Sequence, residues 1–290
     1  MNGILLIDKP AGWTSMDVCA KLRGVFREKR IGHSGTLDPM ATGLLVVFLG
    51  RATRAVEFAE ADEKTYEAAL RLGITTDTQD VTGTVLSQAQ VCVTDGELAA
   101  AYEKFRGEIE QIPPMYSAVK VNGQKLYQLA RKGREVERQP RRITVFALEQ
   151  TGTAENGDVL LRVRCSKGTY IRTLCHDIGA ALGCGGAMSA LRRTHAGAFD
   201  LADAHTLEEV LAAAETGAAE TLLLPVDTLF AAFPALTLTA AQEKVIRNGG
   251  SYTCPEPEER FRLYGKSGEF LALGQVRDGM MRPIKSFFEV

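Results

Sequence analysis

One acidic residue, Asp38, lies in a loop whose composition suits a functional site. The segment GHSGTLDPMATGLLVVFLG, residues 32–50, is rich in glycine, so its main chain can adopt turns that other residues avoid. It leads into the apolar run 44–49, which predicts a strand buried on both faces. A single carboxylate in such a loop raises the question of a functional role for Asp38. On spacing alone, the simpler interpretation is that Asp38 caps a helical turn with Pro39 at the first helical position.

Several other chemistries lack their sequence motifs. The chain contains no GxxxxGK[ST] phosphate loop, no GxGxxG after a predicted strand, no HExxH and no GxSxG. Glycosidases normally need a pair of carboxylates, whereas this loop contains Asp38 alone. What remains is one acid together with basic and aromatic residues in loops.

The six cysteines are scattered and form no CxxC pair. Cys165, Cys175, His176 and Cys184 are conceivable metal ligands, but their spacing matches no zinc pattern. Buried reduced thiols are the favoured interpretation.

The charged residues are unevenly distributed, although the net charge is only −2. From Lys120 to Arg142 there are eight basic and two acidic residues, a local charge of +6. From Lys21 to Arg30 there are five basic residues and one acidic residue, a local charge of +4. One basic run usually means a solvated face, but two runs beside glycine-rich loops favour an RNA or DNA partner.

Length and hydropathy indicate a globular protein of one large domain, or of one domain with a small appendage. The 290 residues are 45% hydrophobic and 24% charged. The apolar runs are shorter than the ~20 residues that a bilayer helix needs. The N-terminal apolar segment is too short for a signal peptide and is interrupted by Asp8. We therefore expect a cytoplasmic protein.

The elements that must position Asp38 can be predicted from periodicity. We expect a first strand at 3–8, and then a helix capped by Ser15 that buries Val18, Leu22, Val25 and Phe26. Further along the chain we expect a short helix at 53–61, a strand at 65–72, a polar turn at 73–80, a strand near Thr84, a helix at 95–107, an excursion at 112–140, strands at 141–152 and 158–166, a helix from Thr169, and a helix at 206–220. Strands and helices mixed without regular βαβ alternation predict an α+β fold.

The chain is similar to the TruB family of tRNA pseudouridine synthases. The similarity rests on the Asp38 segment and on five further motifs: KPAG, KTYEAALRLGITTDTQD, PPMYSAVKVNGQKLYQLARKG, CSKGTYIRT and ALRRTHAG. The motifs occur in family order over nearly the whole chain. The resemblance implies a mixed, largely antiparallel sheet with flanking helices. It also implies a catalytic domain at 1–232 and a small β-rich, PUA-like RNA-binding domain at 233–290.

The resemblance implies that a uridine of the TΨC loop of tRNA, numbered 55 by convention, is isomerised to pseudouridine. Asp38 is then the catalytic aspartate, which either attacks C1′ of the ribose or removes the C2′ proton to leave a glycal. No metal or organic cofactor is implied. The expected partner is the TΨC arm of tRNA, without a membrane or an obligate protein partner, and we expect a monomer.

Two further catalytic residues are implied by the resemblance. Tyr66 is expected to stack on the target base and to help remove its C5 proton, although a core tyrosine of a strand would fit the same position. Arg172 is expected to pair with Asp38 and keep the carboxylate ionised, although a helix-surface arginine would also fit. Asp80 is expected to orient Arg172, and a turn-capping role is an equal alternative.

The remaining implied roles concern substrate binding. Tyr170 and Leu191 are expected to line the uracil pocket, where a core role fits equally well. His33 is expected to occupy the space of the flipped base. His176 stands where an acidic residue is expected, and we interpret it as variation on a helix surface.

The basic excursion at about 113–138 is expected to clamp the RNA arm through phosphate contacts of Lys125, Arg131, Lys132 and Arg134. The terminal domain is expected to hold the acceptor side of the tRNA. Two other classes compete with this function. An RNA-folding protein that has lost catalysis is disfavoured because Asp38, Tyr66 and Arg172 are all present. A nucleoside hydrolase would leave both basic runs unexplained.

Overall fold

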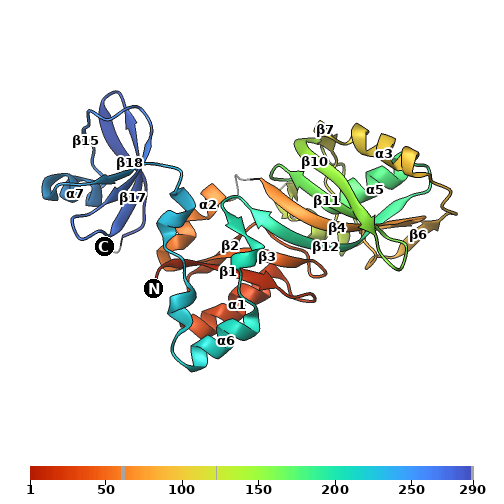
Figure 1. Cartoon of the computed structure of the whole chain (residues 1–290), viewed down its shortest axis with the longest axis horizontal. Coiled ribbons are helices and arrows are strands. Elements are labelled where there is room, and N and C mark those ends of the chain that lie inside the picture. The colour runs from red at the N-terminus through yellow and green to blue at the C-terminus, as the bar shows by residue number, and fades with distance from the viewer. Residues whose placement is uncertain (60–62, 122, 289–290) are drawn as a thin grey trace. The chain divides into compact units, whose positions relative to one another are not determined.

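The computed structural model describes residues 1–59, 63–121 and 123–288, and these fall into two compact units. One unit comprises Met1–Asp38, Leu45–Ala61 and Asp203–Val290, and the other comprises Pro39–Leu44 and Asp62–Ala202. Figure 1 labels the elements of both units. The fold is α+β, as the sequence predicts.

The N-terminal part of the first unit contains three strands of the nine-stranded sheet and a helix that packs on β2. Its elements are β1 (Gly3–Lys9), α1 (Ser15–Phe26), β2 (Ile31–Ser34), the second half of β3 (Thr42–Leu49), η1 (Gly50–Ala55) and α2 (Val56–Ala59). Strand β3 lies between β1 and β2 in strand order. Every residue of β3 after Thr42 is buried, which confirms a strand covered on both faces. The last residues of the predicted helix at 53–61 lie outside the described residues.

Helix α1 begins one residue earlier than the sequence predicts. Thr14, not Ser15, is the N-cap: its side chain accepts from the main-chain N–H of Asp17, whose carboxylate accepts from the N–H of Thr14. Ser15 is the first helical residue, and its hydroxyl is directed to the segment before Asp38. The predicted apolar face is buried at Val18, Leu22 and Phe26.

The rest of the first unit follows Asp203 and includes a second, separate sheet. The elements are α6 (Leu207–Glu215), η3 (Ala219–Leu222), η4 (Val226–Phe230), β14 (Ala235–Thr237), α7 (Ala240–Arg247), β15 (Tyr252–Thr253), β16 (Arg260–Tyr264), β17 (Phe270–Arg277) and β18 (Met280–Ser286). The strand order is β14-β16-β17-β18-β15. This sheet has its own apolar core, which includes Ile246, Leu263 and Met281.

The second unit is built on a long sheet with the order β12-β4-β11-β10-β7, and the first residues of β3 lie beside β12. Its elements are β4 (Lys64–Leu72), β5 (Ile74–Thr76), β6 (Val85–Gln88), α3 (Asp95–Lys104), β7 (Gly107–Gln111), β10 (Arg141–Thr153), β11 (Val159–Cys165), α5 (Ile171–Ala181), β12 (Gly186–Ala196), β13 (Phe199–Asp200) and η2 (Leu201–Asp203). Neighbours from β12 to β7 are antiparallel, whereas β3 and β12 are parallel. The sheet is therefore mixed and largely antiparallel.

Two strands of the second unit were not predicted, and one segment was assigned wrongly. The predicted helix at 95–107 ends at Lys104, and its last residue begins the edge strand β7. The segment 186–196, which had no predicted structure, is the central strand β12. Residues Ile74–Thr76 of the predicted polar turn form β5, which pairs with β6.

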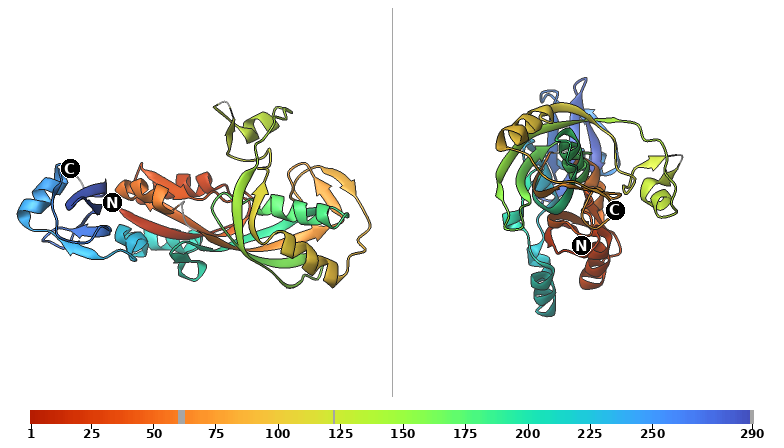
Figure 2. Two further views of the ribbon diagram at one scale, coloured as in Figure 1. Left: turned by 90° about the horizontal axis from the view of Figure 1, so that it is seen from above. Right: turned by 90° about the vertical axis from the view of Figure 1, so that its right-hand side faces the viewer.

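The excursion between β7 and β10 consists of the hairpin β8 (Lys120–Val121) and β9 (Gln124–Lys125), and then the short helix α4 (Leu126–Ala130). Gln111 and Arg141 stand directly opposite each other in the sheet, so both ends of this insertion leave from one rung of the ladder. Figure 2 shows the insertion, in yellow-green, projecting away from the strands that carry it.

None of the helices within the described residues is long and apolar enough to cross a membrane.

Helix α5 packs against β12 and β4, and a glycine permits this contact. A Cβ atom on Gly179 would lie 2.1 Å from the main-chain nitrogen of Gly186.

We expect Gly179→Ala to lower the free energy of unfolding by about 2–3 kcal/mol, because neither the helix backbone nor the strand backbone can move away in the packed core. Gly24 of α1 is a matched control, since a Cβ there meets nothing within 4 Å. Gly24→Ala should raise stability by about 0.5–1 kcal/mol in the same denaturation experiment. Equal effects of the two variants would contradict the close approach.

Candidate active site

The main chain that precedes Asp38 is held by a serine of α1. The hydroxyl of Ser15, which is 1% exposed, accepts a hydrogen bond from the N–H of Leu37 at 2.9 Å and donates one to its carbonyl at 3.1 Å. Asp38 itself is half-buried, and the next two residues, Pro39 and Met40, form a turn. The segment forms a turn and does not continue into a regular helix.

The main chain that follows this turn is held by β12. Gly43 has φ +96°, and a Cβ on it would lie 2.3 Å from the carbonyl oxygen of Arg193, so only glycine fits. Arg193 is 1% exposed and donates from Nε to the carbonyl of Leu44 at 2.7 Å. No role was predicted for Arg193 from the sequence. The signal that could have found it is the pair of adjacent arginines in ALRRTHAG.

Tyr66 lies in β4 with its side chain 7% exposed, between Val163 of β11 and Arg193 of β12. Leu191 stands opposite Ala68, two residues along β4, so Tyr66 and Leu191 share one face of the sheet. The structure therefore brings together a proposed stacking residue and a proposed pocket wall. Both side chains are buried, as a core role also requires.

Arg172 is the second residue of α5 and is only 5% exposed, so its interpretation as a helix-surface arginine is wrong. Its guanidinium donates to the carbonyl of Thr78 at 3.0 Å and to the carbonyl of Tyr116 at 2.8 Å. A carboxylate oxygen of Asp80 lies 3.7 Å from Nη1. These contacts give the buried cation the partners that it needs.

Asp80 combines the two roles that the sequence left open. Its Oδ1 accepts from the hydroxyl of Thr78 at 2.9 Å, and from the N–H and the hydroxyl of Thr82 at 2.9 and 2.5 Å. Its other oxygen faces Arg172. The carboxylate therefore binds its own turn through one oxygen and lies near the guanidinium with the other.

The turn before Asp80 is fastened to α5 by one more contact. Gln79 adopts φ +64°, which is unusual for a residue other than glycine, and its side chain accepts from the hydroxyl of Thr173 at 2.7 Å. Two successive residues of α5, Arg172 and Thr173, therefore bind the turn 78–80.

The remaining predicted binding residues lie in both units. Tyr170 is the half-buried N-cap residue of α5 in the second unit. His33 lies in β2 of the first unit, opposite Val47, and is half-buried. His176 is also half-buried rather than on the helix surface, and its Nδ1 is a buried atom without a hydrogen-bond partner among the described residues.

The cysteines are free thiols, five of them buried, and Cys92 is exposed. Burial raises the pKa of Cys175 to about 12 and that of Cys165 to about 11, so both are neutral at pH 7. Burial also raises the pKa of Asp177, which neighbours His176. Among the residues that the structure describes, no group of three or more His, Cys, Asp or Glu could hold a metal ion.

The four basic residues predicted to contact RNA lie on the insertion. Arg131, Lys132 and Arg134 are exposed, and Lys125 is half-exposed. The cations of Lys125 and Arg131 lie 5.6 and 5.4 Å from the ring centre of Tyr127. These cations are therefore presented to solvent around one aromatic ring.

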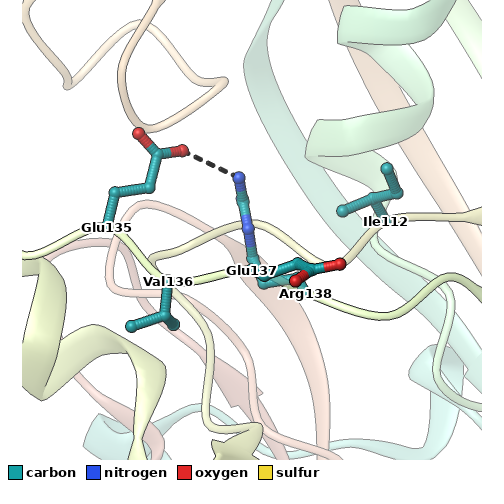
Figure 3. A pocket seen from close by; sticks show the side chains of 5 residues that line it. All are labelled: Ile112, Glu135, Val136, Glu137 and Arg138. Atoms are coloured by element: carbon teal, nitrogen blue, oxygen red, sulfur yellow. Dashed lines mark hydrogen bonds and ion pairs between the residues drawn. The ribbon is translucent and has the colours of Figure 1, made fainter.

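At the root of the insertion, a shallow pocket is lined by Ile112 and residues 135–138 (Figure 3). Arg138 pairs there with Glu135 at 2.9 Å and donates to the carbonyl of Pro113 at 3.2 Å. The C-terminal end of the insertion is thereby tied to its start.

Comparison with known proteins agrees with this architecture. A solved structure described as a Cbf5-Nop10-Gar1 complex contains a chain 27% identical to this one, with a TM-score of 0.75 over 99% of this chain and 85% of that chain. A protein of Azoarcus sp. named tRNA pseudouridine synthase B is 46% identical over 98% of this chain and 94% of its own length. One of the same name from Clostridium kluyveri is 40% identical over 99% of this chain and 100% of its own.

The fold and these relatives define the class of the protein: it is a pseudouridine synthase, an isomerase that acts on uridine. More narrowly, the chain belongs to the TruB family. The family model described as TruB family pseudouridylate synthase (N terminal domain) matches residues 23–171, and the model of the tRNA pseudouridylate synthase B C-terminal domain matches residues 172–231.

The contacts of Arg172 predict that lysine cannot replace it. One ammonium group cannot reproduce the fork that reaches the carbonyls of both Thr78 and Tyr116. We expect Arg172→Lys to lower the free energy of unfolding by about 2 kcal/mol or more, because hydrogen bonds from charged groups are worth about 1.5–3 kcal/mol each. Arg162→Lys, at an exposed position of β11, is the control and should change stability by less than about 0.5 kcal/mol. If denaturant titrations gave Arg172→Lys the same free energy of unfolding as the parent, these contacts would contribute little to stability.

Proposed function

We propose that this enzyme converts one uridine of the TΨC loop of tRNA, at the position numbered 55 by convention, into pseudouridine. The observation that carries the proposal is the loop at Asp38, a carboxylate whose main chain is held before it by Ser15 and after it by Arg193. Full-length relatives named tRNA pseudouridine synthase B support tRNA as the substrate.

The reaction breaks the N1–C1′ bond of uridine and joins C5 to C1′, with loss of the C5 proton and gain of a proton at N1. Asp38 begins it, either by attack on C1′ or by removal of the C2′ proton. Both routes require a carboxylate that is ionised and held in one direction. The hydrogen bonds that hold the main chain at Leu37 and Leu44 support the second requirement.

Three other residues have proposed parts in the chemistry. Arg172 favours the ionised form of Asp38 and is itself oriented by Asp80. Tyr66 stacks on the uracil and assists removal of the C5 proton. The buried positions of Tyr66 and Arg172 support these roles, because a cation or a stacking ring is most effective where water is excluded.

Binding of the uracil is assigned to His33, Tyr170 and Leu191. Tyr170 and Leu191 form walls of the pocket, and His33 fills the place of the base that leaves the stack. Leu191 shares a sheet face with Tyr66, which supports a common pocket for these two residues.

Two surfaces are proposed to bind the RNA away from the target base. The insertion at about 113–138 contacts phosphates through Lys125, Arg131, Lys132 and Arg134. Residues 233–290 form a PUA-like RNA-binding domain beside a catalytic domain at 1–232. A separate five-stranded sheet with its own core supports this division. We propose that the enzyme works as a cytoplasmic monomer on the TΨC arm.

The experiment that tests this function is incubation of the purified chain with an unmodified tRNA transcript, followed by mapping of pseudouridine. We expect one modified site in the TΨC loop, and the same yield after treatment of the enzyme with EDTA. Asp38→Asn, which keeps the size and removes the charge, should lower turnover by at least ~10³-fold because an essential step is lost. Its affinity for tRNA should change little, since phosphate contacts dominate binding.

Near-normal turnover of Asp38→Asn would refute the assignment of the catalytic residue. Tight binding of the transcript by the parent without any pseudouridine would instead identify an RNA-binding protein that has lost catalysis.

The role of the insertion can be separated from the chemistry. We expect glutamine at Lys125, Arg131, Lys132 and Arg134 together to weaken tRNA binding and to reduce the slope of log affinity against log salt by ~0.7–0.9 per lost contact. The single-turnover rate at saturating tRNA should stay within a few-fold of the parent. Lys104→Gln, at an exposed position of α3, serves as the control and should leave the slope unchanged. An unchanged slope in the fourfold variant would mean that the RNA binds elsewhere.

A further inference from the structure

The last residue of β7, Gln111, makes a contact that none of the roles above includes. Gln111 is 2% exposed and is the residue from which the insertion departs. Its side-chain oxygen accepts from the main-chain N–H of Tyr170 at 2.8 Å, and its side-chain nitrogen donates to the carbonyl of the same residue at 3.0 Å. One buried amide therefore binds both main-chain groups of Tyr170.

The contact binds the main chain of Tyr170 at the start of α5, where the carbonyl of Tyr170 also accepts from the N–H of Leu174 at 3.0 Å. Tyr170 lies after the end of β11 and before the first residue of α5, and its own side chain makes no capping hydrogen bond. The side chain of Gln111 acts as one rung of a sheet would, because it supplies a donor and an acceptor to the same residue. The position of Tyr170 is thus fixed from β7.

The neighbouring residue of the site is tied to the same part of the chain. Arg172, two residues after Tyr170, donates to the carbonyl of Tyr116, five residues after Gln111. The segment 111–116, which joins the end of β7 to the insertion, therefore binds both the N-cap residue of α5 and the buried guanidinium. A displacement of this segment must move at least one of these two groups.

We infer that Gln111 is a positioning residue of the isomerase reaction, whose side-chain amide holds Tyr170 and the start of α5 in the arrangement that the reacting uridine requires. The inference rests on the proposed function, in which Tyr170 lines the uracil pocket and Arg172 assists Asp38. The inference also gives the insertion a second role. RNA that binds the insertion would act on the segment 111–116, which holds Tyr170 and Arg172 in place.

Three variants test the inference. Gln111→Met keeps the length of the side chain and removes both hydrogen bonds. Gln111→Glu keeps the acceptor but replaces the donor by a carboxylate that faces the carbonyl of Tyr170. Asp158→Asn is the structural control: Asp158 is 4% exposed and binds Arg71 through two hydrogen bonds of 2.9 and 3.0 Å, at the other end of β4 from Tyr66.

We expect Gln111→Met to lower the single-turnover rate at saturating tRNA transcript by about 10- to 100-fold, while the Kd changes by less than about threefold, because small displacements of positioned groups affect the rate rather than phosphate binding. Asp158→Asn should lower the Tm but keep the saturated rate within about twofold of the parent. A saturated single-turnover rate of Gln111→Met near that of the parent would overturn the inference. So would a fall in the saturated rate of Asp158→Asn that is proportional to its fall in Tm, because the rate would then follow stability alone.

The Gln111→Glu variant adds a pH profile that loss of stability alone does not produce. A buried glutamate has a raised pKa, and its protonated form donates an O–H to the carbonyl of Tyr170 as the amide did. The rate relative to the parent should therefore recover as the pH falls from about 8.5 to about 6, whereas Gln111→Met should show no such recovery. A loss of rate in Gln111→Glu that does not change with pH would contradict the inference. If Gln111→Met does not fold, the pH profile of Gln111→Glu is the deciding measurement.

Amide hydrogen exchange separates this inference from the proposed function. Exchange in the peptide 166–175 should be faster in Gln111→Met than in the parent and unchanged in Asp158→Asn, whether or not the parent forms pseudouridine. A parent that leaves tRNA unmodified would refute the proposed function. A parent that modifies tRNA while Gln111→Met shows unchanged exchange would refute the role of Gln111 alone.

Discussion

A guanidinium without access to water must have its N–H groups bound, and the arrangement of the second unit depends on this constraint. Arg172 and Arg193 are 5% and 1% exposed. The free-energy cost of an unpaired charge buried to this extent would exceed the whole free energy of unfolding of a typical protein. Both side chains donate to main-chain carbonyls: Arg172 to those of Thr78 and Tyr116, and Arg193 to that of Leu44. The segments that carry these carbonyls, two loops and the start of β3, can therefore adopt only conformations that serve the two cations.

Carbonyl partners have a consequence that a carboxylate alone would not have. A carboxylate on a flexible side chain can follow its cation, whereas a carbonyl is part of the main chain and can move only with its loop. The Arg172 guanidinium thus fixes the path of the chain at residues 78 and 116. The carboxylate of Asp80, which lies 3.7 Å from it, is also bound by threonines of its own turn. In the role that we propose for Arg172, its preorganisation would come from the backbone.

The sequence predicted the elements that have a regular pattern and missed those that do not. Strand β3 was predicted because it is uniformly apolar, and β4 and β11 because they are rich in apolar residues. Strand β12 was missed because bulges after Met188 and after Arg193 interrupt the alternation of buried and exposed residues that marks a strand. Strand β7 was missed because it is a short edge strand with glutamates at 108 and 110, and its sequence continues the polarity of the preceding helix.

The residues of the candidate site also fall into those that could be recognised from a local sequence pattern and those that could not. Glycines and the carboxylate at Asp38 could be recognised in the sequence because a loop next to an apolar strand is a local pattern. The side chains that hold the loops could not, because each acts on a main-chain group far away in the sequence: Ser15 on Leu37, 22 residues away, and Arg193 on Leu44, 149 residues away. Buried loops have peptide groups that no ladder satisfies, and a polar side chain from another element must bind them. Residue type shows that a serine, a glutamine or an arginine can do so, but only the fold determines which peptide group it reaches.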